Sequence, residues 1–326
     1  MNVMINILYC LDENYNHQLS VSLLSLLENI DEKLSIYIIH KSESNSNFLP
    51  EKIKCHRNID TISVFKFIKN IENFPKLNKA HVSEATYYRL FINEYLPKEI
   101  DFLLYLDPDV FCTNDPIKYL NQLIIEMDNK DFDIAAYPEI QRKSDSEKLF
   151  QKLNMSNNEY FNAGVMLINF KNWLEKGINK KLVNLIDDLS QDIQFWDQDI
   201  LNSYFDGKYL KLPKSYNYVV NLFYNCDEER KFDLENICKE NVFVHFAGSH
   251  KPWTPVGILS KTAEIYQDIY RKLYKQKYHL IHKWKVNSLK TFKHAFIDGK
   301  LFELKYPLSF TSIFFKTLIF NKNRNI

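Results

Sequence analysis

Residues 101–109 of the chain read DFLLYLDPD, an apolar run that ends in two aspartates around a proline. A run of this length predicts a buried β-strand, and open α/β sheets bind ligands beyond the carboxyl ends of such strands. Asp107 and Asp109 are alternate residues, so both carboxylates can reach one cation while Pro108 stiffens the backbone between them. The stretch therefore predicts an α/β sheet with a divalent-metal site, although the Asp-Xaa-Asp pattern also occurs in ordinary surface loops.

Strands and helices alternate along the chain on both sides of this stretch. Before it, we expect strands at residues 3–11, 34–39 and 62–67, and a helix with apolar positions from Leu19 to Ile30. This alternation predicts parallel strands with helices on both faces of the sheet. Further helices are expected at residues 83–91, 173–189 and 198–205, and further strands at residues 133–137, 164–170 and 242–246.

The charge of the chain is distributed unevenly. At 326 residues, with 45% hydrophobic and 25% charged residues, the chain can bury a substantial core, and its formal charge is only +1. Residues 271–326 nevertheless carry 13 Lys and Arg against Asp298 and Glu303, which is a net charge of +11. The other 29 basic and 39 acidic residues give −10, so a basic tail follows an acidic body.

The cysteines and the N-terminus favour a cytoplasmic protein. The five cysteines are odd in number, scattered and without C-x-x-C spacing, so neither a disulfide framework nor a structural zinc site is indicated: Cys10, Cys55, Cys112, Cys226 and Cys238. The first apolar stretch stops at Asp12 and lacks the basic region and cleavage site of a signal peptide. No window has the long apolar run of a membrane span.

Three further polar clusters follow the two aspartates. They read FNAGV at residues 161–165, WDQDIL at 196–201 and HFAGSHKPW at 245–253. In this order the four clusters resemble the family 8 glycosyltransferases, retaining enzymes that move hexoses from nucleotide sugars, most often UDP-glucose or UDP-galactose. The resemblance runs from about Ile5 to Trp253. It implies the GT-A fold, a Rossmann-like mixed α/β sheet with helices on both faces, here followed by a basic helical tail.

The resemblance implies a metal site and a site for the donor. Asp107, Asp109 and His245 would bind Mn²⁺ or Mg²⁺, although a histidine after an apolar strand is more often a core residue. Similar enzymes would place Gly248 and Lys251 at the phosphates of the donor. Asp107 would also contact the donor through the metal.

Five other residues are expected to contact the nucleotide and the sugar of the donor. Asp12, Asn14 and Tyr15 follow the first strand and would hold the uracil, although Asp and Asn are also common in plain turns. Arg89 would lie beside the donor sugar; the alternative is a surface cation. Asn162 would bond sugar hydroxyls, or else cap a turn.

Asp197 and Gln198 are the candidate catalytic residues. In similar enzymes they lie near the anomeric carbon, opposite the leaving UDP, where a carboxylate can stabilise an oxocarbenium-like transition state. A glutamine amide is a poor nucleophile, and Asp199 is assigned to structure. Retention by front-face attack and retention through a glycosyl-enzyme intermediate both stay open.

We expect residues 1–260 to form the catalytic domain and residues 261–326 a docking tail. The cations of the tail are interleaved with aromatic residues, a pattern typical of peripheral contact with an anionic membrane, here the inner face of the cell membrane. The aromatic residues are Trp284, Phe292, Phe296, Phe302, Phe310, Phe314, Phe315 and Phe320. The alternative is that these side chains pack on the body, with the cations on its acidic surface, or on a partner subunit.

The partners expected are a UDP-hexose, a glycan, glycolipid or glycoprotein acceptor, and in oligomers a second copy of the chain; no nucleic acid is expected.

Two other functions are alternatives to sugar transfer. A haloacid-dehalogenase-type phosphatase also has an Asp-Xaa-Asp loop, but that loop normally opens the chain, whereas more than a hundred residues precede Asp107. A sugar-binding protein that has lost turnover is the second, since a fold does not establish activity.

Overall fold

The structure, a computed structural model, describes residues 6–71, 74–75, 83–139, 143–220, 222 and 234–320. Cys226 and the predicted start of the first strand at Val3 lie outside these residues, as does the side chain of Phe320. The main sheet has seven strands, in the order β3-β2-β1-β4-β7-β6-β8. These are β1 (Asn6–Leu11), β2 (Leu34–His40), β3 (Ile59–Lys66), β4 (Phe102–Leu106), β6 (Ile134–Pro138), β7 (Phe161–Asn169) and β8 (Leu210–Lys211).

The sheet is mixed, as the predicted fold class requires. Strands β3, β2, β1 and β4 are parallel, which confirms the alternation read in the N-terminal half, whereas β7 runs antiparallel to both β4 and β6. The β4–β7 ladder pairs Leu106 with Val165, and the Asp107 amide continues it by donating to the Gly164 carbonyl at 2.8 Å. The antiparallel strand therefore brings the FNAGV run beside the two aspartates.

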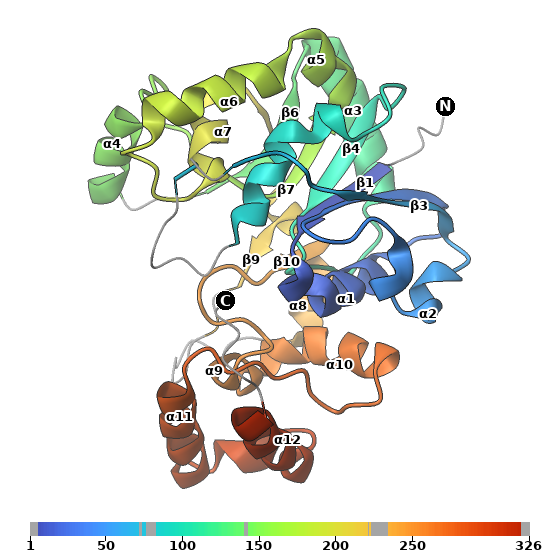
Figure 1. Ribbon diagram of the computed structural model, residues 1–326, viewed down its shortest axis with the longest axis vertical. Coiled ribbons are helices and arrows are strands. Elements are labelled where there is room, and N and C mark those ends of the chain that lie inside the picture. The colour runs from blue at the N-terminus through green and yellow to red at the C-terminus, as the bar shows by residue number, and fades with distance from the viewer. Residues whose placement is uncertain are drawn as a thin grey trace.

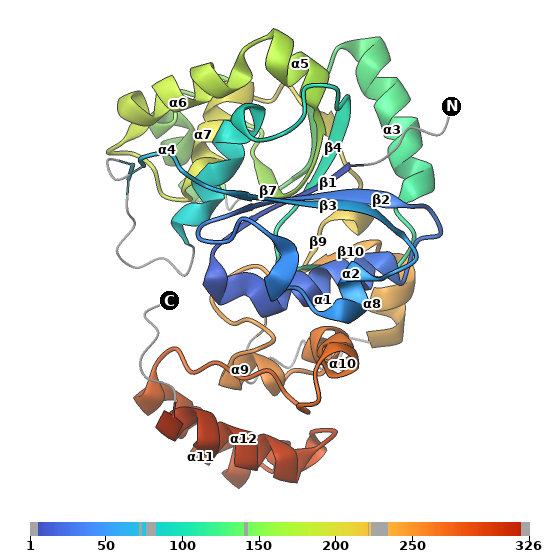
Figure 2. The ribbon, with the colours of Figure 1, turned by 45° about the vertical axis from the view of Figure 1, so that its right-hand side comes forward.

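Helices cover both faces of the sheet (Figures 1 and 2). On one face α1 (Asn16–Leu27), α2 (Glu51–Lys54) and α3 (Ile117–Lys130) pack into a cluster with β1, β2 and β4. On the other face a second cluster unites the sheet with η3 (Glu84–Glu94), α4 (Lys143–Lys152), α5 (Phe170–Glu175), α6 (Ile178–Leu189) and α7 (Asp197–Phe205). Short 3₁₀ turns are η1 (Glu13–Tyr15), η2 (Ser46–Phe48), η4 (Lys214–Tyr216) and η6 (Lys261–Ala263).

Two predicted helices differ in detail from the sequence reading. The segment expected as a helix from residue 83 is a 3₁₀ helix, η3, whose N-cap Ser83 accepts from the Ala85 amide. The helix expected at 173–189 is two helices, because Gly177 adopts φ +59 between α5 and α6. A left-handed residue ends an α-helix, and glycine takes that conformation without steric cost.

A small second sheet and the C-terminal helices complete the fold. Strands β5 (Val110–Cys112), β10 (Phe243–His245) and β9 (Tyr218–Val219) form the sheet, with α8 (Leu234–Glu240) leading into β10. After α9 (Pro255–Ile258), helix α10 (Glu264–Leu273) packs with α1 through a cluster that includes Val21, Tyr266 and Tyr270.

The chain ends in a helical hairpin of α11 (Lys285–Ile297), η7 (Lys300–Glu303) and α12 (Pro307–Phe320), at the bottom of Figure 1. The helices expected in the tail are thus present, while the division at residue 260 stays a prediction. Among the described helices, none combines the length and the apolar character needed to cross a membrane.

Candidate functional site

A cavity of about 550 Å³ opens beyond the carboxyl ends of β1 and β4. Of the twelve predicted site residues, eleven line it: Asp12, Tyr15, Arg89, Asp107, Asp109, Asn162, Asp197, Gln198, His245, Gly248 and Lys251. Asn14 is the exception, since its side chain does not line the cavity and its backbone amide donates to Asp12 at 2.9 Å. The structure thus gathers residues that are up to 239 positions apart in the chain.

Asp107, Asp109 and His245 form a cluster that can hold a metal ion. One ligand atom from each lies within 4.8 Å of the others, and two carboxylates with an imidazole suit Mn²⁺. The buried Oδ1 of Asp109 accepts no hydrogen bond from the described residues and lies 3.4 Å from Nε2 of His245. A buried acceptor without a donor, set between two other ligands, fits a divalent cation.

The other oxygen of Asp109 is already paired. Its Oδ2 accepts from the Lys251 ammonium at 2.5 Å, and this lysine also donates to the Phe246 carbonyl at 2.7 Å. Burial alone would raise the pKa of Asp109, but Lys251 and His245 outweigh it and hold that pKa well below its usual range. The carboxylate is therefore ionised and ready to bind a cation.

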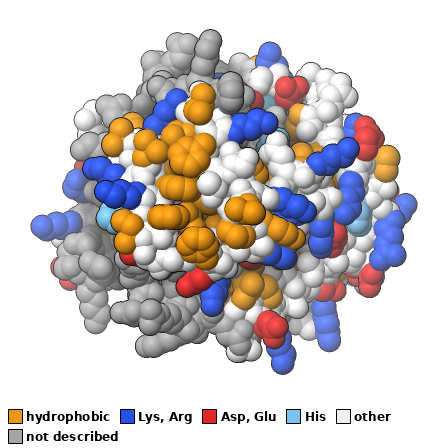
Figure 3. Space-filling view, turned by 90° about the horizontal axis from the view of Figure 1, so that it is seen from below, with side chains coloured by type: hydrophobic (Ala, Val, Ile, Leu, Met, Phe, Trp, Pro, Cys, Tyr) orange, Lys and Arg blue, Asp and Glu red, His pale blue; other side chains and the backbone are white. Residues whose placement is uncertain are grey.

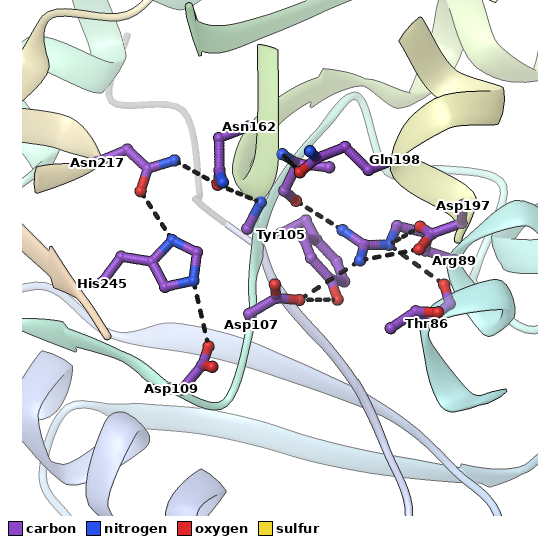
Figure 4. Close-up of polar contacts among 12 residues, drawn as sticks. Thr86, Arg89, Tyr105, Asp107, Asp109, Asn162, Asp197, Gln198, Asn217 and His245 are labelled. Atoms are coloured by element: carbon purple, nitrogen blue, oxygen red, sulfur yellow. Dashed lines mark hydrogen bonds and ion pairs between the residues drawn. The ribbon is translucent and has the colours of Figure 1, made fainter. Parts of the chain in front are cut away.

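A chain of hydrogen bonds fixes which nitrogen of His245 faces the metal cluster (Figure 4). The Gly164 amide can only donate, so the Asn162 atom 3.0 Å away is the oxygen, and the Asn217 atom 2.9 Å from that oxygen is the amide nitrogen. The Asn217 oxygen then lies 3.0 Å from Nδ1 of His245, which must carry the proton. The other nitrogen, Nε2, therefore faces Asp109 and is the one that can serve as a metal ligand.

Gly164 leaves the space that the metal cluster occupies. A Cβ at this position would lie 2.4 Å from Cε1 of His245 and 3.0 Å from Oδ2 of Asp107. Neither neighbour can withdraw easily, because Asn217 holds His245, and Tyr105 donates to Oδ1 of Asp107 at 2.6 Å. The glycine is therefore needed for close approach of β7 to the site.

Arg89 lies at the centre of the cavity wall and is buried, so the alternative of a surface cation is wrong. Its Nε lies 2.5 Å from Oδ2 of Asp197, and its Nη2 lies 3.5 Å from Oδ1 of Asp107. The Arg89 guanidinium also donates to the Ala163 carbonyl at 2.6 Å and lies over the Tyr105 ring, 4.2 Å from its centroid. One fixed cation thus connects the candidate metal site to the candidate catalytic carboxylate.

Asp197 is the first residue of α7 and is almost fully buried. Burial raises its pKa to about 7, and the positive charge of Arg89 offsets only part of that effect. The preceding residue, Trp196, has φ +54 and ψ −134, which is unfavourable for a residue with a side chain. Such strain persists where the surroundings enforce it and is concentrated at functional sites.

Gln198 and Asp199 face different partners. Gln198 accepts from the Ala163 amide at 3.0 Å and donates to the Glu139 carboxylate at 3.3 Å, at the edge of the cavity. Asp199 accepts from the amides of Gln194 and Phe195 at 2.6 and 2.8 Å and does not line the cavity. Its contacts hold the loop before α7, in agreement with a structural role.

Asp12 and Tyr15 lie at the end of β1, where the nucleotide base was expected. Asp12 accepts from the Ser83 hydroxyl at 2.5 Å, and the Tyr15 ring contacts the Trp253 ring edge-on, with centroids 6.2 Å apart. Trp253 is buried in the cluster of α10. Gly248, which also lines the cavity, has φ +82, a conformation that favours glycine.

Sequence reasoning missed three residues of this site: Glu139, Tyr105 and Asn217. Glu139 directly follows β6, so the rule that pointed to Asp107 and Asp12 would have found it. Tyr105 lies within an apolar strand and reads as a core residue. Asn217 lies between short elements, and no periodic signal marks it.

Comparison with known proteins finds relatives that match most of the chain. Glycosyl transferase family 8 matches residues 6–257. The chain is 28% identical over 315 residues to the lipopolysaccharide 1,2-glucosyltransferase of Escherichia coli, covering 92% of this chain and 90% of that one. It is 28% identical over 264 residues to the lipopolysaccharide 1,3-galactosyltransferase of Salmonella typhimurium, covering 77% of this chain and 74% of that one.

Among solved structures, the galactosyltransferase LgtC, in complex with donor and acceptor sugar analogues, is similar with a TM-score of 0.66 and 26% identity. The match covers 83% of this chain and 96% of that chain. The predicted GT-A fold is thereby confirmed.

Proposed function

The chain belongs to glycosyl transferase family 8 and is related to lipopolysaccharide hexosyltransferases, and we propose that it transfers glucose or galactose from a UDP-sugar with retention of configuration. The acceptor is a glycan, glycolipid or glycoprotein. One observation carries the proposal: a three-residue metal cluster and a buried Arg89–Asp197 pair share one cavity. The phosphatase alternative loses its basis, because the match places the aspartate loop inside a transferase domain.

The donor would extend along the cavity from the end of β1 to the loop after β10. Asp12 and Tyr15 stand at the first end, where a carboxylate can accept from a uracil N–H and a phenol ring can stack on the base. Gly248 and Lys251 come from the loop after β10 and also line the cavity, where a backbone amide and an ammonium can meet phosphate oxygens. Asn162 and Arg89 line the same cavity and would contact the proposed sugar.

Asp107, Asp109 and His245 would hold Mn²⁺ or Mg²⁺, which supplies charge neutralisation for a departing diphosphate. The chain supplies the rest. Asn217 keeps the proton of His245 on Nδ1, and Lys251 adds a second positive charge at the same place. Because these groups are already paired and oriented, little reorganisation is needed when the leaving group gains charge.

Asp197 would act on the sugar itself. Its buried carboxylate, held by Arg89, can stabilise positive charge at the anomeric carbon as the bond to UDP breaks. The side-chain amide of Gln198 accepts from Ala163 through its oxygen and donates to Glu139 through its nitrogen. Gln198 would therefore orient a sugar rather than attack it.

The proposed reaction takes place at the inner face of the cell membrane. Support comes from the net charge of +11 on residues 271–326 and from the relatives that act in lipopolysaccharide synthesis. A glycan carried by a lipid would be available to the enzyme at such a surface.

A screen of UDP-sugars for UDP release, without acceptor, tests the proposal. We expect release from UDP-glucose or UDP-galactose with Mn²⁺ and none with EDTA. We also expect UDP with Mn²⁺ to raise the melting temperature more than ADP or GDP does, since ligands stabilise the state they bind. Protection by UDP without release from any sugar would favour the binding protein that has lost turnover, and equal protection by all three nucleotides would contradict the uracil site.

A further inference from the structure

The C-terminal hairpin has a small hydrophobic core of its own. Phe310 and Phe314 of α12, Ala295 of α11 and Leu301 of η7 are buried together, with Tyr278 and Leu280 from the segment before α11. Phe292 is partly buried against them, with its ring centroid 4.6 Å from that of Phe314. Some tail aromatics thus pack inward, but mostly on other residues of the tail and not on the body, where the alternative expected them.

Most of the remaining large apolar side chains of the hairpin are exposed to solvent. Nine of the twelve exposed large hydrophobic residues found in the described chain belong to residues 284–319, with exposed fractions of 40% to 86%. We call them the hairpin face: Trp284, Val286, Leu289, Phe296, Ile297, Phe302, Leu308, Phe315 and Ile319. The underside of the molecule shows apolar side chains gathered in one patch (Figure 3), and the Phe296 and Phe302 rings lie 6.0 Å apart. Such a patch marks an interaction surface.

Cations accompany the hairpin face without carboxylate partners. Lys285, Lys290, Lys293 and Lys316 are exposed, and none forms an ion pair with a carboxylate in the described part of the chain. By contrast, Arg271 pairs with Glu264, and Lys272 lies 2.5 Å from Glu28. Lys272 is thus paired on the body, as the alternative predicted, and Lys305 is paired with Asp268 of α10. The four exposed lysines have no such carboxylate partner in the described chain and are available to an outside partner.

We propose that the hairpin face docks on an anionic lipid surface. Its aromatic and aliphatic side chains would enter the boundary of the acyl chains while the lysines meet lipid phosphates. A second copy of the chain fits less well, because two such faces would bring their lysines together. This inference deepens the proposed location at the membrane, because it names the surface that would bind there, and it does not depend on the proposed sugar transfer.

The hairpin face is tied to the loop that lines the cavity. The side-chain amide of Gln267 donates to the carbonyls of Pro252 and His279 at 2.8 and 3.0 Å. The Ile281 amide donates to the Trp253 carbonyl at 2.8 Å. These bonds connect the segment leading into α11 with the loop that contributes Gly248 and Lys251 to the cavity. Docking would therefore fix how the cavity is oriented toward the lipid surface.

Sedimentation of the full chain with vesicles tests the proposal, with phosphatidylcholine alone compared with a mixture containing phosphatidylglycerol. The face variant combines Phe296→Ser, Ile297→Ser and Phe302→Ser; the charge variant combines Lys285→Gln, Lys290→Gln and Lys293→Gln. Matched controls remove exposed residues of the same kinds from the body: Ile68→Ser with Ile125→Ser, and Lys33→Gln with Lys98→Gln and Lys180→Gln.

We expect the unmodified chain to bind the anionic vesicles at low salt and to leave them as salt screens the charges. The charge variant should lose binding on the order of 100-fold, at about fivefold for each lysine, and the face variant should also lose it. Both body controls should bind as the unmodified chain does. All variants should release UDP alike without vesicles, because none of these residues lines the cavity.

Two outcomes would overturn the proposal. In the first, the unmodified chain stays in solution with anionic vesicles at low salt, or the body controls lose as much binding as the hairpin variants. In the second, light scattering shows an oligomer that the face variant dissolves, and vesicles bind no protein. The face would then belong to a second copy of the chain.

Discussion

The cavity buries charged side chains, whereas the hairpin exposes aromatic ones. Arg89 and Asp197 are 4% and 1% exposed, and Phe296 and Phe302 are 58% and 68% exposed. Each arrangement opposes the usual partition, in which burying a charge is costly and burying an aromatic ring is favourable. In the cavity the cost is offset by pairing, as between Arg89 and Asp197 and between Asp109 and Lys251. In the hairpin, no contact within the described chain offsets the cost of exposing the aromatic rings.

The two regions therefore differ in the kind of ligand or partner that they can bind. The cavity contains a polar network whose members fix one another, so its ligands need only small and well-placed charges. The hairpin has a surface without directional bonds, so its partner needs apolar depth and negative charge. Substitutions in the cavity should therefore change chemistry, and those that leave a buried charge unpaired should also lower stability, whereas substitutions on the hairpin face should change neither.

Asp107→Ala and Asp109→Ala should have the largest effect. Either removes a ligand from the three-residue cluster, and we expect metal-dependent UDP release to fall at least ~10³-fold because the leaving diphosphate loses its counter-charge. Circular dichroism should show an unchanged fold. Full turnover of the unmodified protein in EDTA would contradict the metal role.

Gly164→Ala tests whether the cluster depends on close packing. The new Cβ would overlap His245, which Asn217 prevents from moving, and we expect release to fall on the order of 100-fold. Gly177→Ala is the matched control, since it meets no atom within 4 Å and only strains a left-handed residue. Similar activity of the two variants would show that β7 can yield at this point.

Asn217→Ala separates orientation from ligation. Without the Asn217 oxygen, the proton of His245 is no longer held on Nδ1, and Mn²⁺ affinity measured by titration should fall about 10- to 100-fold. Asn217→Asp keeps an acceptor and should lose less. Asn241→Ala removes another buried asparagine, whose side chain donates to the Ile237 carbonyl of α8, and should leave Mn²⁺ affinity unchanged. Equal affinity of all three variants would remove Asn217 from the site.

The same contrast explains what the sequence could predict. Asp107 and Asp12 were readable because each follows an apolar run, and strand ends converge at one edge of a parallel sheet. Asn217 was not readable, because its role depends on two partners, Asn162 and His245, that are distant in the sequence. The break at Gly177 was not predicted, because the apolar residues on both sides of this one glycine follow a helical pattern.

For the hairpin, only the composition of the sequence allowed a prediction. Its alternation of cations and aromatics predicted a basic helical tail for docking, but α11 carries both buried and exposed apolar residues. Which rings turn inward depends on α12, so Phe314 and Phe315, adjacent in the sequence, end up buried and exposed. Such a choice belongs to packing between helices and not to the period of one helix.

The pH dependence of kcat/KM should show a smaller effect at Asp197. Burial raises its pKa to about 7, and only the carboxylate can stabilise positive charge, so kcat/KM should rise about tenfold from pH 6 to pH 8. The free energy of unfolding changes in the opposite direction. The folded state keeps Asp197 protonated at pH values where the unfolded chain has already lost this proton, so Asp197 lowers stability as pH rises from about 4 to about 7. Asp197→Asn should flatten the rising limb; a limb that persists would assign it to another group.

Phe296→Ser should have the smallest effect on the isolated protein. Its ring is 58% exposed, so the free energy of unfolding should change by about 0.5 kcal/mol or less. Phe314→Ala, in the same hairpin but fully buried, should cost about 3–5 kcal/mol locally, seen as faster hydrogen exchange in α11 and α12. The pair decides what the exposed rings are for. If Phe296→Ser destabilises the hairpin as much as Phe314→Ala does, the exposed rings serve folding, and the contrast between the two regions disappears. If it does not, stability gives no reason for exposed rings, and their role lies in what the hairpin touches.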